Sequence, residues 1–234
     1  MKRINHDHHR DSTDELLSRL LRGEAGGGEL EHALLNEFHR GCPVSKLRLL
    51  LHAEDDKAAA AGMWIASELG ISAKPLFRDI VKLMCHRAIK VRFFSLDCVL
   101  VCAGSRDASA INLGVDLIDD PEFAVRWKAM VFLTSVNDTL LRAALIARMW
   151  HDKSDQRAQR FLQLLASVGT RDSAAILVAL TDGDLLVRRF AAAMGARMTA
   201  RDLDPINQAV QSTEPTIRQF AQDMLARFRI EQRR

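Results

Sequence analysis

The chain has 234 residues, of which 48% are hydrophobic and 27% are charged, with a formal net charge of +3. These proportions are ordinary for a soluble protein, and the length suffices for a sizeable hydrophobic core. The near balance of 33 basic and 30 acidic residues counts against a nucleic-acid partner. No stretch is apolar enough to span a membrane, and no secretory signal is visible. We therefore expect a cytoplasmic protein with no membrane partner.

Residues 1–43 are predicted to hold a disordered tail and N-terminal capping helices. The first residues are polar, and a frayed tail is favoured over a loose metal site formed by His6, Asp7, His8 and His9. Ser12 followed by Glu15 is a capping-box pattern, which predicts a first helix to about residue 22. After three glycines, the apolar spacing predicts a second helix that ends near Gly41.

Residues 44–234 read as a series of helix pairs. A short helix is expected from 44 to 52, and the apolar residues beyond it recur at intervals of three and four rather than two. The first helix of each later pair is expected at 75–86, 108–119, 139–150, 173–181 and 205–211. Asp107, Asp138 and Asp172 are predicted N-caps of three of these helices. Trp150 ends one of them and is predicted to be a core residue.

The second helices of these pairs share one register. Their anchor residues are Ala58, Val91, Val125, Ala158, Val187 and Ile217, at spacings of 33, 34, 33, 29 and 30 residues. The residue after the anchor is arginine in four of the six helices, and the fourth residue after it is small in five. A period in this range is the signature of a solenoid, in which stacked repeats share a continuous core. The sequence therefore predicts an all-α repeat array.

Two blocks of the chain resemble the HEAT repeat. They run from Asp120 through Arg126 to Ala129, and from Asp182 through Arg188 to Ala191. The match covers roughly residues 44–225, and its period is similar to the short, phycobilisome-lyase type of HEAT repeat. The resemblance implies a right-handed α-solenoid of antiparallel helix pairs. It also implies a structural ladder between an Asp of the turn and an Arg of the second helix, here Arg92, Arg126, Arg188 and Arg218. The repeat at Ala158 departs from the pattern, because Gln159 stands in the arginine position.

A partner-binding face is predicted on the second helices. Positions two, five and six after each anchor point away from the predicted core, and they are apolar in the early repeats and polar in the late ones. A continuous apolar patch on this face would mark an interaction site. The candidate partner-binding residues are Trp64, Phe93, Leu96, Asp97, Trp127, Met130, Arg160 and Arg189. The alternative is that these side chains pack between adjacent second helices.

No catalytic motif is present, so we expect no enzyme activity, and no cofactor is expected. Cys98 and Cys102 lie one helical turn apart, and a buried core position is favoured over a metal site. The function that fits best is a non-enzymatic scaffold that binds another protein. The segment 61–70, which contains Trp64, resembles bacterial HEAT-type proteins, some of which are immunity partners of interbacterial toxins. That resemblance implies a toxin domain as the partner.

The alternative is a nucleic-acid-binding HEAT-like protein or a DNA glycosylase. Four evenly spaced arginines could follow a phosphate backbone, and Asp97 projects beside Phe93 and Trp127, as an acid and aromatics do in HEAT-like glycosylases. The acids six residues before Arg126 and Arg188 favour the structural ladder instead. The near-neutral charge and the absence of tyrosine also count against the alternative.

Overall fold

The computed structural model describes residues 12–24 and 28–232, and within these ranges it contains helices and turns but no strand. The histidines and the tail predicted in residues 1–11 lie outside the described ranges. The α-helices are α1 (Thr13–Leu21), α2 (Glu29–His39), α3 (Arg48–Leu51), α4 (Asp56–Glu68), α5 (Phe77–Leu83), α6 (Ile89–Cys102), α7 (Ala108–Asp116), α8 (Phe123–Ser135), α9 (Asp138–His151), α10 (Gln156–Thr170), α11 (Ser173–Ala179), α12 (Leu185–Met198), α13 (Asp204–Val210) and α14 (Pro215–Glu231). Three 3-10 helices join them: η1 (Val44–Leu47), η2 (Gly70–Leu76) and η3 (Leu117–Asp119).

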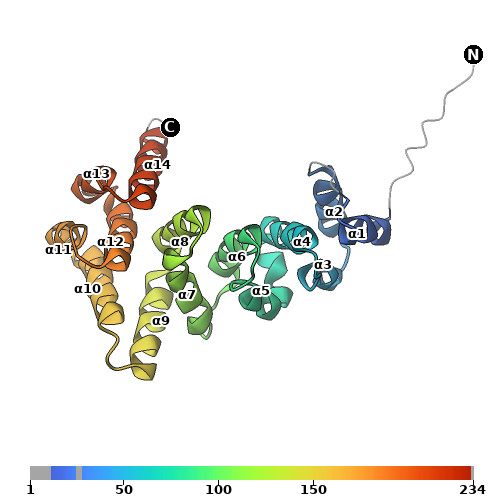
Figure 1. Ribbon diagram of the computed structural model, residues 1–234, viewed down its shortest axis with the longest axis horizontal. Coiled ribbons are helices and arrows are strands. Elements are labelled where there is room, and N and C mark those ends of the chain that lie inside the picture. Colours follow the sequence, from blue (N-terminus) through green and yellow to red (C-terminus); the bar gives the residue numbers. More distant parts are fainter. Residues whose placement is uncertain (1–11, 25–27, 233–234) are drawn as a thin grey trace, which may run out of the picture.

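The helices pack in sequential pairs, which confirms the all-α prediction. Figure 1 shows α4, α6 and α8 side by side in one row, with α5, α7 and α9 along the other side of that row. Each of the six predicted anchor residues is at most 1% exposed, so the register of the second helices is also confirmed. The cap helices α1 and α2 lie against α3 and α4 at one end of the row.

Carboxylate or amide side chains cap the N-termini of α4, α9, α10, α11, α12 and α14. Asp172 caps α11 by accepting the Ala175 N–H, as predicted. The cap of α9 is Asn137, one residue before the predicted Asp138. Asp107 precedes α7 but accepts the N–H of Gly104 and makes no capping bond to its helix.

Glycines allow three of the helix pairs to approach closely. A Cβ atom at Gly62 of α4 would lie 2.7 Å from the Cβ of Leu50 in α3. One at Gly114 of α7 would lie 2.6 Å from the Phe132 ring in α8, and one at Gly195 of α12 would lie 2.9 Å from Pro205 in α13. These distances are too short for carbon atoms, so any larger residue would force each pair apart. The close crossing of each pair therefore requires glycine at that position.

The stack departs from a plain nearest-neighbour array after α8. Helix α12 packs directly against α8, and α14 also contacts α8, whereas α10 packs against α9, α11 and α12. The reason lies in the outer surface of α10, where Gln159, Arg160 and Gln163 are exposed. Helix α12 instead presents a run of small buried residues, Ala191, Ala192 and Ala193, which allow close packing. The C-terminal repeats consequently fold back along α8.

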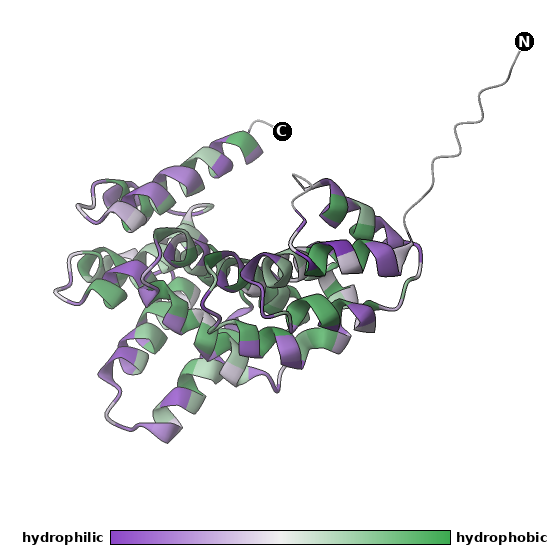
Figure 2. Ribbon diagram, turned by 45° about the vertical axis from the view of Figure 1, so that its right-hand side comes forward, coloured by the Kyte–Doolittle hydropathy of each residue, from purple (hydrophilic) through white to green (hydrophobic). Residues whose placement is uncertain are grey.

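The hydrophobic core follows the row of helices. In Figure 2 the helices at the centre of the molecule are mostly green, whereas α14, which leads to the C-terminus, is largely purple. No single helix in the described ranges is long and apolar enough to cross a membrane. Helices α8 and α9 pass by length and composition only when taken together, and they are bent by 115° relative to each other.

The predicted core position of Trp150 is wrong, because its side chain is 77% exposed. Trp150 lies in the last turn of α9, and Figure 1 shows this end of α9 extending beyond the neighbouring α7. Cys98 and Cys102 are buried, as expected, and burial raises the pKa of both thiols.

The small residues at the fourth position after the anchor yield a stability prediction. Ala129 and Ala191 are fully buried between helices, so Ala129→Leu or Ala191→Leu should lower the free energy of unfolding by about 1–3 kcal/mol through overpacking. Urea denaturation followed by circular dichroism measures this change. Ala124→Leu, at an exposed position of the same helix α8, is the control and should change little. Unchanged stability in both core variants would contradict the packing described above.

Candidate protein-binding face

Three residues of the predicted face do not reach the surface. Leu96 and Met130 are fully buried, and Arg189 is 5% exposed, so the prediction that they project outward is wrong. Because α6, α8 and α12 pack closely, the side chains at these positions contact the neighbouring second helix. This is the alternative that the sequence left open, and it holds for the middle of the row. The exposed part of the predicted face lies nearer the N-terminal end of the row, around Trp64 of α4.

A groove of about 820 Å³ lies between the cap helices α1 and α2 and the second helices α4 and α6. We call it the α2–α6 groove, and its apolar lining comes mainly from Leu20, Ala60, Ala61, Trp64, Ile89 and Phe94. Trp64 is half-buried and packs against the ring of His32, with the ring centroids 4.7 Å apart. Phe94 is also half-buried here, and Ile89 is 41% exposed. Trp64 is therefore the one predicted aromatic residue that lines a groove.

Charges of both signs surround the apolar lining. Lys57 and Lys90 line the groove, and their ammonium groups have no ion-pair partner among the described residues. Glu31 also lines it, and its buried Oε2 atom accepts no hydrogen bond from the described part of the chain. Arg87, by contrast, is bound to the carboxylate of Asp56 at 2.7 Å. The groove thus combines an apolar interior with charged groups that are still available for a ligand.

Phe93 and Asp97 form a bridge from α6 to α8. The Lys128 ammonium lies 2.6 Å from the Asp97 carboxylate and 5.0 Å from the centroid of the Phe93 ring. Both contacts are favourable for a cation that is mostly shielded from water. The Asp97 carboxylate is accordingly engaged with an ammonium group. The glycosylase alternative would require that carboxylate to act on a substrate.

Trp127 is fixed against the C-terminal helix rather than facing the groove. Its indole N–H donates a hydrogen bond of 2.9 Å to the Asp223 carboxylate of α14. The guanidinium of Arg227, also in α14, lies 5.8 Å from the ring centroid. Trp127 is half-buried and therefore belongs to the α8–α14 contact.

Three of the four predicted ladder arginines, Arg92, Arg126 and Arg218, bind main-chain carbonyl groups. Arg92 donates to the carbonyl oxygens of His86 and Arg87 at 2.7 and 2.9 Å. Arg126 donates to those of Asp120 and Pro121 at 2.8 and 2.7 Å, and the same pattern joins Arg218 to the carbonyl of Ser212. In each case the acceptor lies five or six residues earlier. The guanidinium thus satisfies carbonyls at the turn that precedes its own helix.

In two turns an acid pairs with an arginine of the preceding repeat. Arg92 donates two hydrogen bonds of 2.7 and 2.9 Å to the Asp120 carboxylate, and this bonding raises the pKa of Arg92. Asp182 likewise binds Arg160, which replaces the ladder arginine in the irregular repeat. Arg160 was predicted to face a partner, and it is exposed but engaged in this pair. Arg188 has no such bond, and its buried Nε lacks a partner among the described residues.

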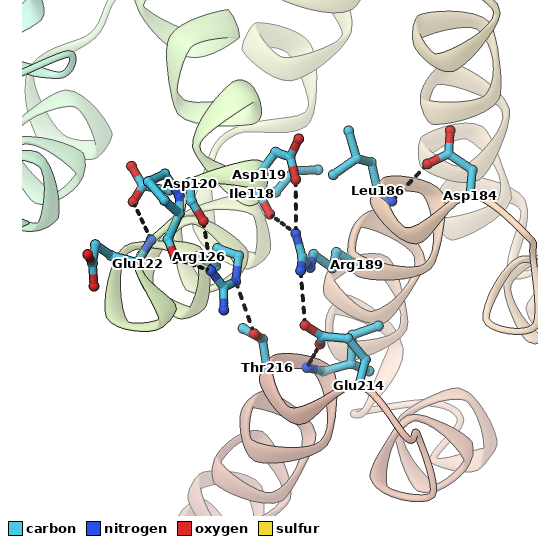
Figure 3. Close-up of polar contacts among 12 residues, drawn as sticks. Ile118, Asp119, Asp120, Glu122, Arg126, Asp184, Leu186, Arg189, Glu214 and Thr216 are labelled. Carbon is cyan, nitrogen blue, oxygen red and sulfur yellow. Dashed lines mark hydrogen bonds and ion pairs between the residues drawn. The ribbon is translucent and has the colours of Figure 1, made fainter.

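Two buried arginines of α12 attach it to both ends of α8. Arg189 donates to the carbonyl oxygen of Ile118 at 2.8 Å and lies 3.3 Å from Asp119, just before α8 begins (Figure 3). Arg197 donates to the carbonyl oxygens of Leu133 and Val136 where α8 ends. Sequence reasoning missed the role of Arg197, because both of its acceptors lie more than 60 residues away.

Glu214 completes the junction with α14. One carboxylate oxygen lies 3.0 Å from the Arg189 guanidinium, and the other accepts the Ile217 N–H at 2.6 Å, which caps α14 (Figure 3). Arg126 reaches the same turn by donating to the Thr216 hydroxyl at 3.2 Å. Burial alone would raise the pKa of Glu214, but the bonds from the Ile217 amide and from Arg189 outweigh it and hold the pKa below its usual value.

This junction yields a pH-dependent prediction. Because the folded-state pKa of Glu214 lies below its unfolded value of about 4.3, the carboxylate stabilises the fold above that pH and loses this effect as the pH falls through the folded pKa. Glu214→Gln should therefore cost about 3 kcal/mol of unfolding free energy near neutral pH, since it leaves the buried Arg189 without its close partner. The difference from the unmodified chain should shrink as the pH approaches about 3.

Chemical denaturation at a series of pH values measures this difference. Asp119→Asn is the control, because Asp119 contacts the same arginine but its side chain is 64% exposed. This change should cost at most about 1 kcal/mol. Equal effects of the two substitutions, or a Glu214→Gln effect that does not depend on pH, would refute the role assigned to Glu214.

Comparisons with known proteins are sparse. No protein-family model matches the chain, and no curated protein matches it. Among solved structures, the chain is similar to the crystal structure of an engineered protein from the Northeast Structural Genomics Consortium, at 17% sequence identity and a TM-score of 0.41. The similarity covers 79% of this chain and 96% of the engineered one. A likeness of this degree assigns neither a ligand nor an activity to the chain.

Proposed function

We propose that this chain is a non-enzymatic helical-repeat scaffold that binds another protein in the α2–α6 groove. The observation that carries the proposal is a half-buried indole, Trp64, in an apolar groove of about 820 Å³. Tryptophan is among the residues most enriched at the energetic centres of protein interfaces. The exposed Ile89 and the half-buried Phe94 extend the same apolar surface along α6.

The residues that line the groove indicate the chemistry of the segment that would bind there. A segment with one apolar face would cover Trp64 and Ile89, as an amphipathic helix does in a hydrophobic groove. Acidic side chains beside that face would meet Lys57 and Lys90, and a single cation would meet the buried carboxylate oxygen of Glu31. We therefore propose an amphipathic helical segment that carries charges of both signs as the bound element.

The sharper form of the proposal is that the partner is a bacterial toxin domain, which the chain neutralises. It is supported by the resemblance of residues 61–70 to bacterial HEAT-type proteins, because that segment contains Trp64 of the α2–α6 groove. A toxin gene beside the gene for this chain would supply the partner. Co-expression should restore growth with the unmodified chain and fail to do so with Ile89→Glu. If both forms restore growth, the groove is not needed for neutralisation, and this form of the proposal is refuted.

Peptide selection tests the broader proposal and needs no identified partner. Helical peptides selected against the folded chain should bind the groove and change the fluorescence of Trp64 in a Trp127→Phe, Trp150→Phe background. Ile89→Glu should weaken the selected peptides by about 2 kcal/mol, roughly thirtyfold, because it places a charge in the apolar contact. Isothermal titration calorimetry measures the affinity, and a thermal melt verifies that the variant is folded.

Two controls separate the groove from other surfaces. Ile71→Glu changes an isoleucine that is 63% exposed and does not line the groove, so peptide affinity should stay the same. Trp127→Ala removes the bond to Asp223 and should lower the melting temperature while leaving peptide affinity unchanged. Peptides that bind Ile89→Glu as tightly as the unmodified chain would refute the α2–α6 groove as the binding site.

A further inference from the structure

A second cavity, of about 650 Å³, lies among the first helices and their turns. We call it the basic pocket. Its charged lining consists of Arg48 from α3, Lys74 from η2, Arg78, Asp79 and Lys82 from α5, and Arg106 and Asp107 from the turn between α6 and α7. Five of these side chains are cationic and two are anionic. The α2–α6 groove shares no residue with this pocket.

Both carboxylates of the basic pocket are already bound. Asp79 accepts a hydrogen bond of 2.9 Å from Arg48 and lies 3.2 Å from the His52 ring nitrogen. Asp107 accepts the N–H of Gly104 at 2.7 Å and lies 3.7 Å from the ammonium of Lys74. Lys74 also donates to the carbonyl oxygen of Cys102. The acids therefore hold the walls of the pocket together and do not neutralise its other cations.

Three cations of the basic pocket have no such partner. Arg78, Lys82 and Arg106 are exposed, and their side chains make no hydrogen bond or ion pair with any described residue. Like charges that line one cavity repel one another, so an anion placed among them gains from all three. Arginine supplies a fork of donors that matches phosphate oxygens, and lysine supplies a compact point charge for them.

The turn before α7 adds one further donor to the basic pocket. The hydroxyl of Ser105 also lines the pocket and makes no hydrogen bond with the described residues.

We propose that the basic pocket binds a small molecule that carries an oligophosphate group, meaning two or more linked phosphates. Such a group presents several negative charges over a short length, which lets it meet Arg78, Lys82 and Arg106 together. The cavity volume exceeds the space that the phosphates alone would fill, so an attached group such as a nucleoside also fits. This site is separate from the proposed protein-binding groove and stands without it.

Calorimetric titration of the full chain with sodium tripolyphosphate, ATP and adenosine tests the proposal. At about 50 mM salt, tripolyphosphate and ATP should bind and adenosine should not, and binding should weaken at about 200 mM salt because the contacts are electrostatic. An ATP affinity well above that of tripolyphosphate would identify a nucleoside polyphosphate as the ligand class, and equal affinities would identify the oligophosphate chain itself. Absence of tripolyphosphate binding at the lower salt concentration would overturn the proposal.

Matched variants show whether binding occurs in the pocket. The triple variant Arg78→Gln, Lys82→Gln, Arg106→Gln should lose at least about tenfold in tripolyphosphate affinity, since three charge-assisted contacts are removed. The control variant carries the same charge change at exposed cations outside the pocket, Arg142→Gln, Lys153→Gln and Arg201→Gln, and should change affinity by less than about twofold. Equal losses in the two variants would show a general charge effect and refute the site.

A single-stranded DNA oligonucleotide provides the final comparison. If the ligand is a small oligophosphate, tripolyphosphate should displace any bound DNA from the pocket. A DNA affinity that exceeds that of tripolyphosphate, and that falls equally in both triple variants, would indicate an open polyanion surface and contradict the proposal. Melting temperatures of the two variants should match that of the unmodified chain, because all six substituted side chains are exposed.

Discussion

The buried guanidinium of Arg189 is the interaction on which the C-terminal half of the molecule depends. A cation taken out of water costs several kcal/mol unless charged and polar partners surround it. Arg189 finds three partners on two segments: the Ile118 carbonyl and the Asp119 carboxylate of η3, and the Glu214 carboxylate at the start of α14. Because Glu214 also caps α14, one side chain fixes η3, α12 and α14 relative to one another. Arg197 repeats the arrangement at the other end of α8.

Two kinds of order therefore meet in the chain. From α3 to α8 each helix pair rests on its neighbour, and ladder pairs such as Arg92 with Asp120 join successive repeats. Beyond α8, the C-terminal helices are joined to α8 and its flanking turns by long-range side-chain hydrogen bonds, such as those of Arg189 and Arg197. The α2–α6 groove lies in the first region, between the cap helices and the row. The proposed partner-binding groove and the region joined to α8 by these long-range contacts are thus built from different parts of the molecule.

Local periodicity sufficed to predict the helices and their registers, because burial at every third or fourth position depends on near neighbours. Periodicity could not predict that Leu96, Met130 and Arg189 are buried. Each second helix has a neighbouring second helix on both sides, and the repeat period does not reveal how closely these helices approach. Of the candidate face, Trp64 was found from its position alone. Phe94, Ile89 and the basic pocket were missed, because each depends on which segments the turns bring together. Arg160 was assigned to the face because Gln159 holds the ladder position in its repeat, yet Arg160 pairs with Asp182 of the next turn.

The contacts that tie α8 to the C-terminal helices also bear on how the chain acquires its structure. A plain repeat array folds from any starting point, because every repeat meets only adjacent sequence. Here the Leu133 carbonyl is bound by Arg197, 64 residues later in the chain, and Trp127 is bound by Asp223, 96 residues later. Closing such long loops slows folding. During synthesis from the N-terminus, α3 to α7 can assemble as they emerge, while one flank of α8 stays bare until α12 has left the ribosome. That interval is the period in which the nascent protein is most open to aggregation and to capture by chaperones.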